Sequence, residues 1–172
     1  MGGITTNTPN RILYGTDGYV TVDGTDIGAT LGQIEVQWSV DQYYPDLAQA
    51  RGPVSGTGKV VGGEFSISVT LAEWDYDTLS NVMGSIGADS SGTSEKFGGA
   101  ALDDVTEVSN VVVTGITRKD GKAFTATIPT AYVEVDGFVL EEGKEAGLKV
   151  TFHGLYTTSA PTTLPGYIEI EK

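Results

Sequence analysis

Two runs of strictly alternating polar and apolar residues constrain the fold more than any other feature of the sequence. They cover residues 33–41 and 64–71. A period of two places successive side chains on opposite faces of an extended strand. Each run therefore predicts a strand with one buried and one solvated face, and the two strands are natural antiparallel partners. The predicted core face carries Ile34, Val36, Trp38, Val40, Phe65, Ile67, Val69 and Leu71.

The rest of the pattern is that of a β-rich chain with many turns. Asp23-Gly24 and Asp120-Gly121 are turn signals, and the second lies between two β-prone runs, which indicates a hairpin. About seven strands in one chain favour an all-β fold, either a β-sandwich or an open β-barrel. The further strands are predicted at residues 19–22, 111–116, 123–128, 132–135 and 148–156.

Three segments interrupt the predicted strands. Residues 72–83 predict one short flanking α-helix that must pack on the sheet, because so short a helix is not stable alone. Residues 43–63 form a long inter-strand loop, which is either a contact-making element or a floppy surface excursion. Residues 85–99 are rich in Gly and Ser and predict a mobile loop.

These elements predict a single domain over residues 1–172. Residues 1–18 are expected to be an N-terminal arm, and residues 19–156 the β core. Residues 157–172 contain two prolines and predict an extended C-terminal arm.

Composition narrows the class of protein. The chain has 172 residues, 39% of them hydrophobic, so it can bury a core without staples. It has no cysteine, and its net charge of −13 would repel nucleic-acid phosphates. The sequence shows neither a transmembrane run nor a signal peptide, so we expect a protein made and folded in the cytoplasm, with no membrane partner.

Residues able to carry out catalysis are few. The only histidine, His153, lies in a predicted strand and is expected to be structural. With one histidine and no cysteine, the chain has few residues that could form the usual nucleophile–base pairs or sets of zinc ligands. The Gly56-Thr57-Gly58-Lys59 run lacks the spacing of a phosphate-binding loop. A pair of carboxylates for glycoside hydrolysis is still possible, because the distance between two such groups is set by the fold and not by the sequence spacing. We expect that the protein is not an enzyme and that it binds no cofactor and no metal.

Three blocks of the sequence, residues 31–40, 64–79 and 148–156, resemble the major tail tube proteins of long-tailed bacteriophages. In that family two strands flank a long loop, and the second strand runs into a short helix. The likeness spans about residues 19–156. It implies a β-sandwich or barrel with one flanking helix, hexameric rings, and stacking of those rings into a tube for genome delivery.

The resemblance also implies roles for particular surfaces. The polar faces of the two alternating strands would line an acidic lumen, whose charge repels passing DNA over roughly 8 Å. The long loop and the terminal arms would bridge successive rings. The basic cluster at residues 118–122 is either a solvated turn or a contact with an acidic neighbour. The lumen-facing candidates are Glu35, Gln37, Ser39, Asp41, Glu64, Ser66, Ser68 and Thr70. The inter-subunit candidates are Tyr43, Tyr44, Pro45, Arg51, Lys59, Arg118, Lys119 and Lys122.

The expected partners follow from the same resemblance. They are further copies of the chain, a tape measure protein, tail terminator or tip proteins, and DNA in transient passage. The expected location is the virion tail, and the host cytoplasm during assembly. Two alternatives stay open: another β-rich virion or secretion-tube component, and a small carbohydrate-binding β-sandwich. The second would use stacking aromatics such as Trp38, Tyr43, Tyr44 and Trp74, although Trp38 belongs to the predicted core face.

Overall fold

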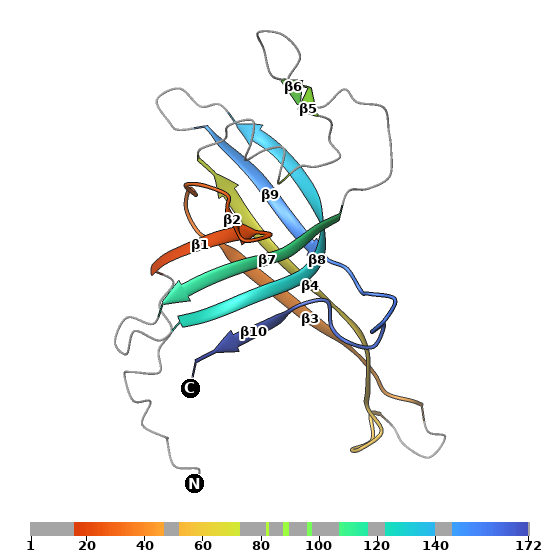
Figure 1. The fold of residues 1–172 in the computed structure, drawn as a ribbon. Coiled ribbons are helices and arrows are strands. Elements are labelled where there is room, and N and C mark those ends of the chain that lie inside the picture. The colour runs from red at the N-terminus through yellow and green to blue at the C-terminus, as the bar shows by residue number, and fades with distance from the viewer. Residues whose placement is uncertain are drawn as a thin grey trace.

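The computed structural model describes residues 16–46, 52–72, 82, 88–89, 96–97, 107–116, 123–139 and 146–171. These residues form an open antiparallel sheet of eight strands in the order β2-β1-β7-β8-β9-β4-β3, with β10 also paired to β8 (Figure 1). The expected all-β class, a sandwich or open barrel, is confirmed. The strands are β1 Thr16–Val22, β2 Thr25–Asp26, β3 Glu35–Tyr43, β4 Lys59–Leu71, β5 Ala88–Asp89, β6 Lys96–Phe97, β7 Glu107–Ile116, β8 Ala123–Val139, β9 Gly147–Gly154 and β10 Tyr167–Ile170.

The two alternating runs became β3 and β4, and they pair antiparallel as predicted. The register sets Glu35 opposite Ser68 and Ser39 opposite Glu64. It shifts between Asp41 and Gln42, where β4 accommodates one extra residue. β3 ends two residues later than its sequence pattern, and β4 begins five residues earlier than its own, so the predicted loop of residues 43–63 shrinks to residues 44–58.

The strand β8 joins two strands that the sequence predicted as separate. Its first half pairs with β7 up to Tyr132, and its second half pairs with β9 from Ala131 onward. The prediction failed because Pro129 looks like a strand breaker. Asn110, with a φ of 51°, lies opposite this proline, between the pairs Ser109–Thr130 and Val111–Ile128. Together they form a corner at which both strands bend and still remain paired.

The C-terminal segment differs from the expected extended arm. β10 runs along the edge of β8 that β9 leaves free, and Tyr167 is opposite Thr127 there. Residues 155–166, between β9 and β10, leave the sheet and return to it. The prolines end before residue 167, so residues 167–170, which include Ile168 and Ile170, are free to form a strand. Pairing with β8 gives the backbone groups of this strand hydrogen-bond partners. The predicted N-terminal arm is described only from Thr16, which already belongs to β1.

The core lies between the two halves of the curled sheet. One cluster of buried side chains contains members of β1, β7 and the first half of β8, together with members of β4 and β9. Ile67, Leu71, Val150 and Phe152 on the second side are completely buried. The predicted core face of β4 is therefore confirmed. On β3, only Ile34 just before the strand and Val36 within it pack against the core.

The first hairpin turn has the conformation that its sequence predicts. Asp23 and Gly24 have φ values of 50° and 79°, and Val22 pairs with Thr25. Two central residues with positive φ are the mark of a type I′ turn, which matches the twist of the strands. The tip of the second predicted hairpin lies outside the described residues, although Ile116 and Ala123 pair on either side of it.

The predicted helix of residues 72–83 lies outside the described residues except for its first residue and Val82. Val82 is helical and completely buried. Within the predicted mobile loop of residues 85–99, the described parts pair as β5 and β6, which the lack of periodicity did not indicate. Among the described residues, no helix has the length and apolar character needed to cross a membrane.

Candidate assembly surfaces

A polar face extends across four neighbouring strands, β3, β4, β9 and β8. Residues opposite each other in an antiparallel pair project from the same side of the sheet. Gln37 is opposite Ser66, and Ser66 is opposite His153. His153 is in turn opposite Tyr132 of β8. We call this surface the polar face; it comprises the polar positions of residues 35–41, 64–70, 149–153 and 132–136.

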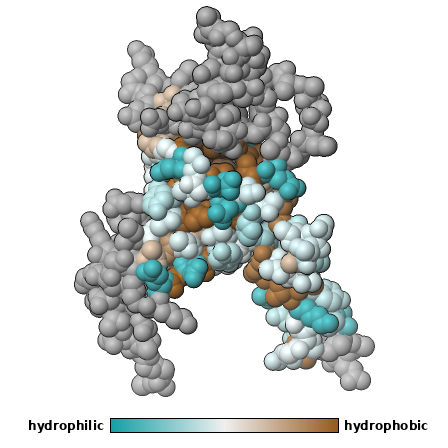
Figure 2. All heavy atoms as spheres, in the orientation of Figure 1, coloured by the Kyte–Doolittle hydropathy of each residue, from teal (hydrophilic) through white to brown (hydrophobic). Residues whose placement is uncertain are grey.

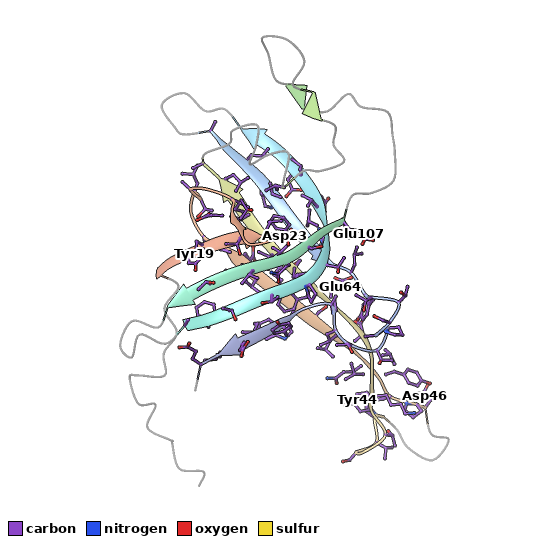
Figure 3. The ribbon with its side chains drawn as sticks, viewed as in Figure 1. Tyr19, Asp23, Tyr44, Asp46, Glu64 and Glu107 are labelled. Carbon is purple, nitrogen blue, oxygen red and sulfur yellow. The ribbon has the colours of Figure 1, made fainter. Side chains whose placement is uncertain are left out.

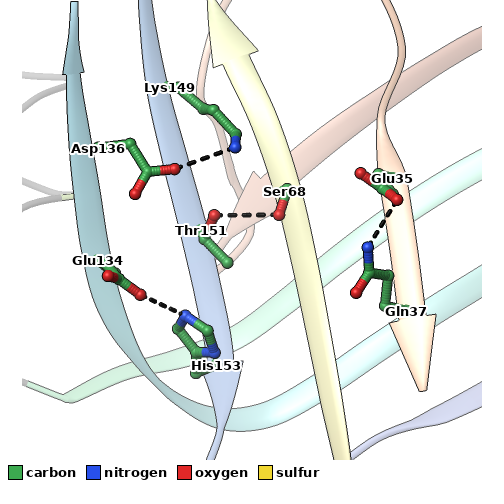
Figure 4. Close-up of polar contacts among 8 residues, drawn as sticks. All are labelled: Glu35, Gln37, Ser68, Glu134, Asp136, Lys149, Thr151 and His153. Carbon is green, nitrogen blue, oxygen red and sulfur yellow. Dashed lines mark hydrogen bonds and ion pairs between the residues drawn. The ribbon is translucent and has the colours of Figure 1, made fainter. Parts of the chain in front are cut away.

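Side chains on the polar face bind one another across the strands (Figure 4). The hydroxyls of Ser68 and Thr151 lie 3.0 Å apart. His153 Nε2 donates to a Glu134 carboxylate oxygen at 2.8 Å. The His153 ring also stacks on Tyr132, with centroids 4.8 Å apart and planes at 14°. The only histidine is therefore held in place by hydrogen bonding and stacking, as a structural residue would be.

The polar face is strongly acidic. It carries five carboxylates, and the only lysine described on it is Lys149, whose ammonium lies 3.1 Å from Asp136. Five negative charges and one positive charge leave −4, with His153 counted as neutral. The carboxylates belong to Glu35, Asp41, Glu64, Glu134 and Asp136. Such a face repels polyanions, and it also repels a second copy of itself.

Among the described residues, the four-stranded sheet under the polar face has two open edges. β3 pairs with β4 on one side, and in the described part of the chain no strand covers its other side. Residues 133–139 of β8 pair with β9, whereas the pairing of β8 with β7 ends at Tyr132. Exposed sheet edges offer free backbone donors and acceptors to another chain.

The outer half of the β3–β4 hairpin projects from the body as an arm (Figure 1). We define the arm as residues 38–43 of β3 and 59–64 of β4. β9 pairs with β4 only up to Ser66, so the arm lies beyond the sheet. Figure 3 shows Glu64 at the root of the arm, and Tyr44 and Asp46 near its far end.

The arm and the residues next to it carry large apolar side chains in contact with water. In Figure 2 the strongly hydrophobic residues of the lower right projection are brown, whereas tryptophan and tyrosine are pale on this hydropathy scale. Trp38 is 61% exposed, Val60 62% and Val61 64%. Tyr43 and Tyr44 are exposed as well. Exposed apolar side chains that gather on one part of a surface are typical of a site of contact with another molecule.

The exposure of Trp38 contradicts its assignment to the core. The alternation of β3 is as regular at Trp38 and Val40 as at Val36, so the pattern does not distinguish the buried positions from the exposed ones. The apolar face of β3 meets the core only near its beginning, because the opposing half of the sheet ends there. Trp38 and Val40 lie on the same face of β3 as Val36, but they are exposed to solvent because the core does not extend to them.

A groove of about 310 Å³ lies where β1 approaches the segment before β3. Every residue that lines it is uncharged, so it offers no acid–base pair. Among the described residues, no group of three or more histidine, aspartate or glutamate side chains could hold a metal ion. The groove is lined by Gly18, Thr30, Gly32, Gln33, Ile34, Val36, Val113, Thr114, Gly115 and Phe124.

The structure brings the eight lumen candidates together on one face. Residues 35, 37, 39 and 41 and Glu64 are exposed, and Ser66, Ser68 and Thr70 are half-buried. Of the contact candidates, Tyr43, Tyr44, Pro45 and Lys59 gather at the outer part of the arm. The four others, Arg51, Arg118, Lys119 and Lys122, lie outside the described residues.

Sequence reasoning missed half of the polar face. β8 and β9 contribute Tyr132, Glu134, Lys149, Thr151 and His153 to it. The alternation of polar positions 149, 151 and 153 was a signal for this, but only the strand pairing shows that they continue the face of β4. No feature of the sequence indicated that the apolar side chains of the arm would be exposed to solvent.

Comparison with known proteins adds no family: no protein-family model matches the chain, and no curated protein matches it. The fold and its surfaces therefore define the class of this protein. It is an open-sheet, all-β domain with an acidic polar face, two open sheet edges and an apolar arm.

Proposed function

We propose that this protein is a structural subunit that assembles with copies of itself into a tube, of the kind found in bacteriophage tails. The observation that carries the proposal is the four-stranded sheet with one polar face and two open edges. The sequence resemblance to major tail tube proteins supports the same function. In this proposal the protein is not an enzyme and needs no cofactor.

Rings follow from the position of the open edges. The free edge of β3 and residues 133–139 of β8 lie on opposite sides of the same sheet. Pairing β3 of one copy with β8 of the next joins two different surfaces, and such head-to-tail contacts close into a ring if the rotation fits. A ring of six copies, as the resemblance implies, would join six sheets into one barrel.

The polar face belongs on the inside of this barrel. Its carboxylates then line the channel, and Lys149 is the single lysine among the described residues of the face that could hold a phosphate. DNA would pass without being retained. The apolar arm would contact a neighbouring copy or the next ring, because burial of Trp38 and Val60 removes apolar surface from water.

The biological setting belongs to the same proposal. The tube would form part of a virion tail, with a tape measure protein inside it and a terminator or tip protein at its ends. Assembly would take place in the host cytoplasm.

A second candidate function is carbohydrate binding. The exposure of Trp38 favours it, because a tryptophan in solvent can stack on a sugar ring. Tyr43 and Tyr44 lie further along the same hairpin. This candidate requires a monomer that binds glycans, whereas the tube subunit requires assembly without a ligand.

Labelling of single cysteines tests the proposed placement of the polar face. The chain has no cysteine, so Ser39→Cys and Ser109→Cys each introduce one thiol. Both serines are exposed, but Ser39 lies on the polar face and Ser109 lies on β7. In assembled material, we expect a small maleimide to label both, and a maleimide on a large polyethylene glycol to label only Ser109→Cys.

The dissociated monomer is the control, in which both reagents should label both variants. Equal labelling of the two assembled variants by the large reagent would contradict an enclosed polar face. A protein that stays monomeric and gives a signal on a glycan array would instead favour the carbohydrate-binding candidate.

A further inference from the structure

The root of the arm has the features of a hinge. Gly62 and Gly63 are adjacent in β4, and the register shift of the β3–β4 ladder lies directly beyond them. Glycine permits more backbone conformations than any other residue, and an irregular ladder is locally weaker. β9 gives no support here, because its pairing with β4 ends at Ser66. By these features alone, the arm would swing about its root.

The segment of residues 155–166 occupies the position beside the root that β9 leaves free. It begins as a continuation of β9, since the Leu155 amide donates to the Thr130 carbonyl at 2.8 Å. The chain then makes two turns, in which the Ala160 amide donates a hydrogen bond to the Thr157 carbonyl and the Thr163 amide donates one to the Ala160 carbonyl. It returns to the sheet through Pro165 and Gly166, which are both buried.

Contacts from both ends of this segment converge on the hinge. The Tyr156 hydroxyl donates to the Gly63 carbonyl at 2.8 Å. A methyl group of Leu164 lies so close that a Cβ on Gly63 would be 2.8 Å from it. A Cβ there would meet the Ser39 backbone oxygen even more closely, so the pairing of the two arm strands itself requires glycine at Gly63. The Leu164 methyl group packs into the space that the missing side chain leaves.

We propose that residues 155–166 act as a brace that fixes the angle of the arm in the isolated subunit. Tyr156 holds the backbone of the hinge through one hydrogen bond, and Leu164 packs against it. The arm is thus set before any partner binds, and association does not carry the cost of ordering it. The inference concerns the monomer and goes beyond the proposed function, so it stands or falls separately from tube assembly.

Hydrogen exchange in the dilute monomer tests the brace. The variant Tyr156→Phe removes the hydroxyl, and the double variant with Leu164→Ala also removes the packing. Because one hydrogen bond contributes a free energy that corresponds to about a fivefold change, we expect amides of the arm such as Val40 and Val60 to exchange about fivefold faster in Tyr156→Phe. The double variant should show a larger increase. Amides of the core strands, such as Ile67 and Val150, should be unchanged.

The matched control is Tyr19→Phe, since Tyr19 is an exposed tyrosine of β1, in the other half of the sheet. It should leave exchange in the arm as in the parent protein. Arm amides that exchange equally in the parent and in both brace variants would overturn the proposal. So would arm amides that exchange in the parent as fast as in an unfolded chain. Tyr156→Phe alone keeps the ring, so the test remains valid if the double variant does not fold.

Discussion

Thr151 is a buried polar side chain on the polar face, with 9% of its surface exposed. Its hydroxyl lies 3.0 Å from that of Ser68. We expect Thr151→Val to lower the free energy of unfolding by about 1 kcal/mol, because the half-buried Ser68 hydroxyl loses its partner. Urea denaturation of Thr151→Val, Ser68→Ala and the double variant measures the coupling. Strictly additive effects would show that the two hydroxyls do not stabilise the fold together.

The packing around Gly115 leaves no room for a side chain, because a Cβ there would enter the ring of Phe124. We expect Gly115→Ala to destabilise the fold by about 1–3 kcal/mol through overpacking. Gly52, where a Cβ would meet nothing within 4 Å, supplies the control Gly52→Ala. Thermal unfolding checks both variants. Equal midpoints would mean that the Phe124 ring moves aside without cost.

At the scale of elements, β3 and β4 were predictable and β8 was not. The alternation of β4 predicted its buried residues correctly, because the core covers that face along the whole alternating run. The same pattern in β3 misled at Trp38, because alternation reports which way a side chain points and not what lies opposite. Pro129 concealed the length of β8, since a corner with Asn110 accommodates a proline that a straight strand would exclude.

The arm is exposed in the monomer, and in the proposed tube it contacts a neighbouring copy. Trp38→Ala should change the free energy of unfolding of the monomer by no more than about 0.5 kcal/mol, as expected for an exposed site. The same variant should lose assembly, because the arm loses its largest apolar side chain. Chemical denaturation measures the free energy of unfolding, and analytical ultracentrifugation measures assembly. Tyr19→Ala, an exposed aromatic outside the arm, is the control and should assemble normally. Normal assembly of Trp38→Ala would remove the arm from the interface.

For the whole molecule, charge opposes the association that the sheet edges favour. Joining β3 of one copy to β8 of the next brings Glu35 and Asp41 toward Glu134 and Asp136. We therefore expect assembly to be weak at about 10 mM salt and to increase at about 150 mM, as the Debye length falls from roughly 30 Å to roughly 8 Å. Light scattering against salt concentration measures this.

Replacing the charges separates this effect from a general effect of salt on apolar contacts. The double variant Glu35→Gln, Glu134→Gln should assemble at lower salt than the parent protein. Glu107→Gln changes one charge on β7 and should shift the salt dependence much less. A shift in Glu107→Gln about half as large as that of the double variant, in proportion to the charge removed, would mean that net charge matters and the proposed edge contact does not.

Electron microscopy of the concentrated protein at about 150 mM salt shows whether the subunits assemble into a tube. We expect open-centred rings, alone or stacked into tubes with a regular axial repeat, in the absence of any ligand or partner. Particles that remain single subunits at every protein and salt concentration would contradict the proposed function.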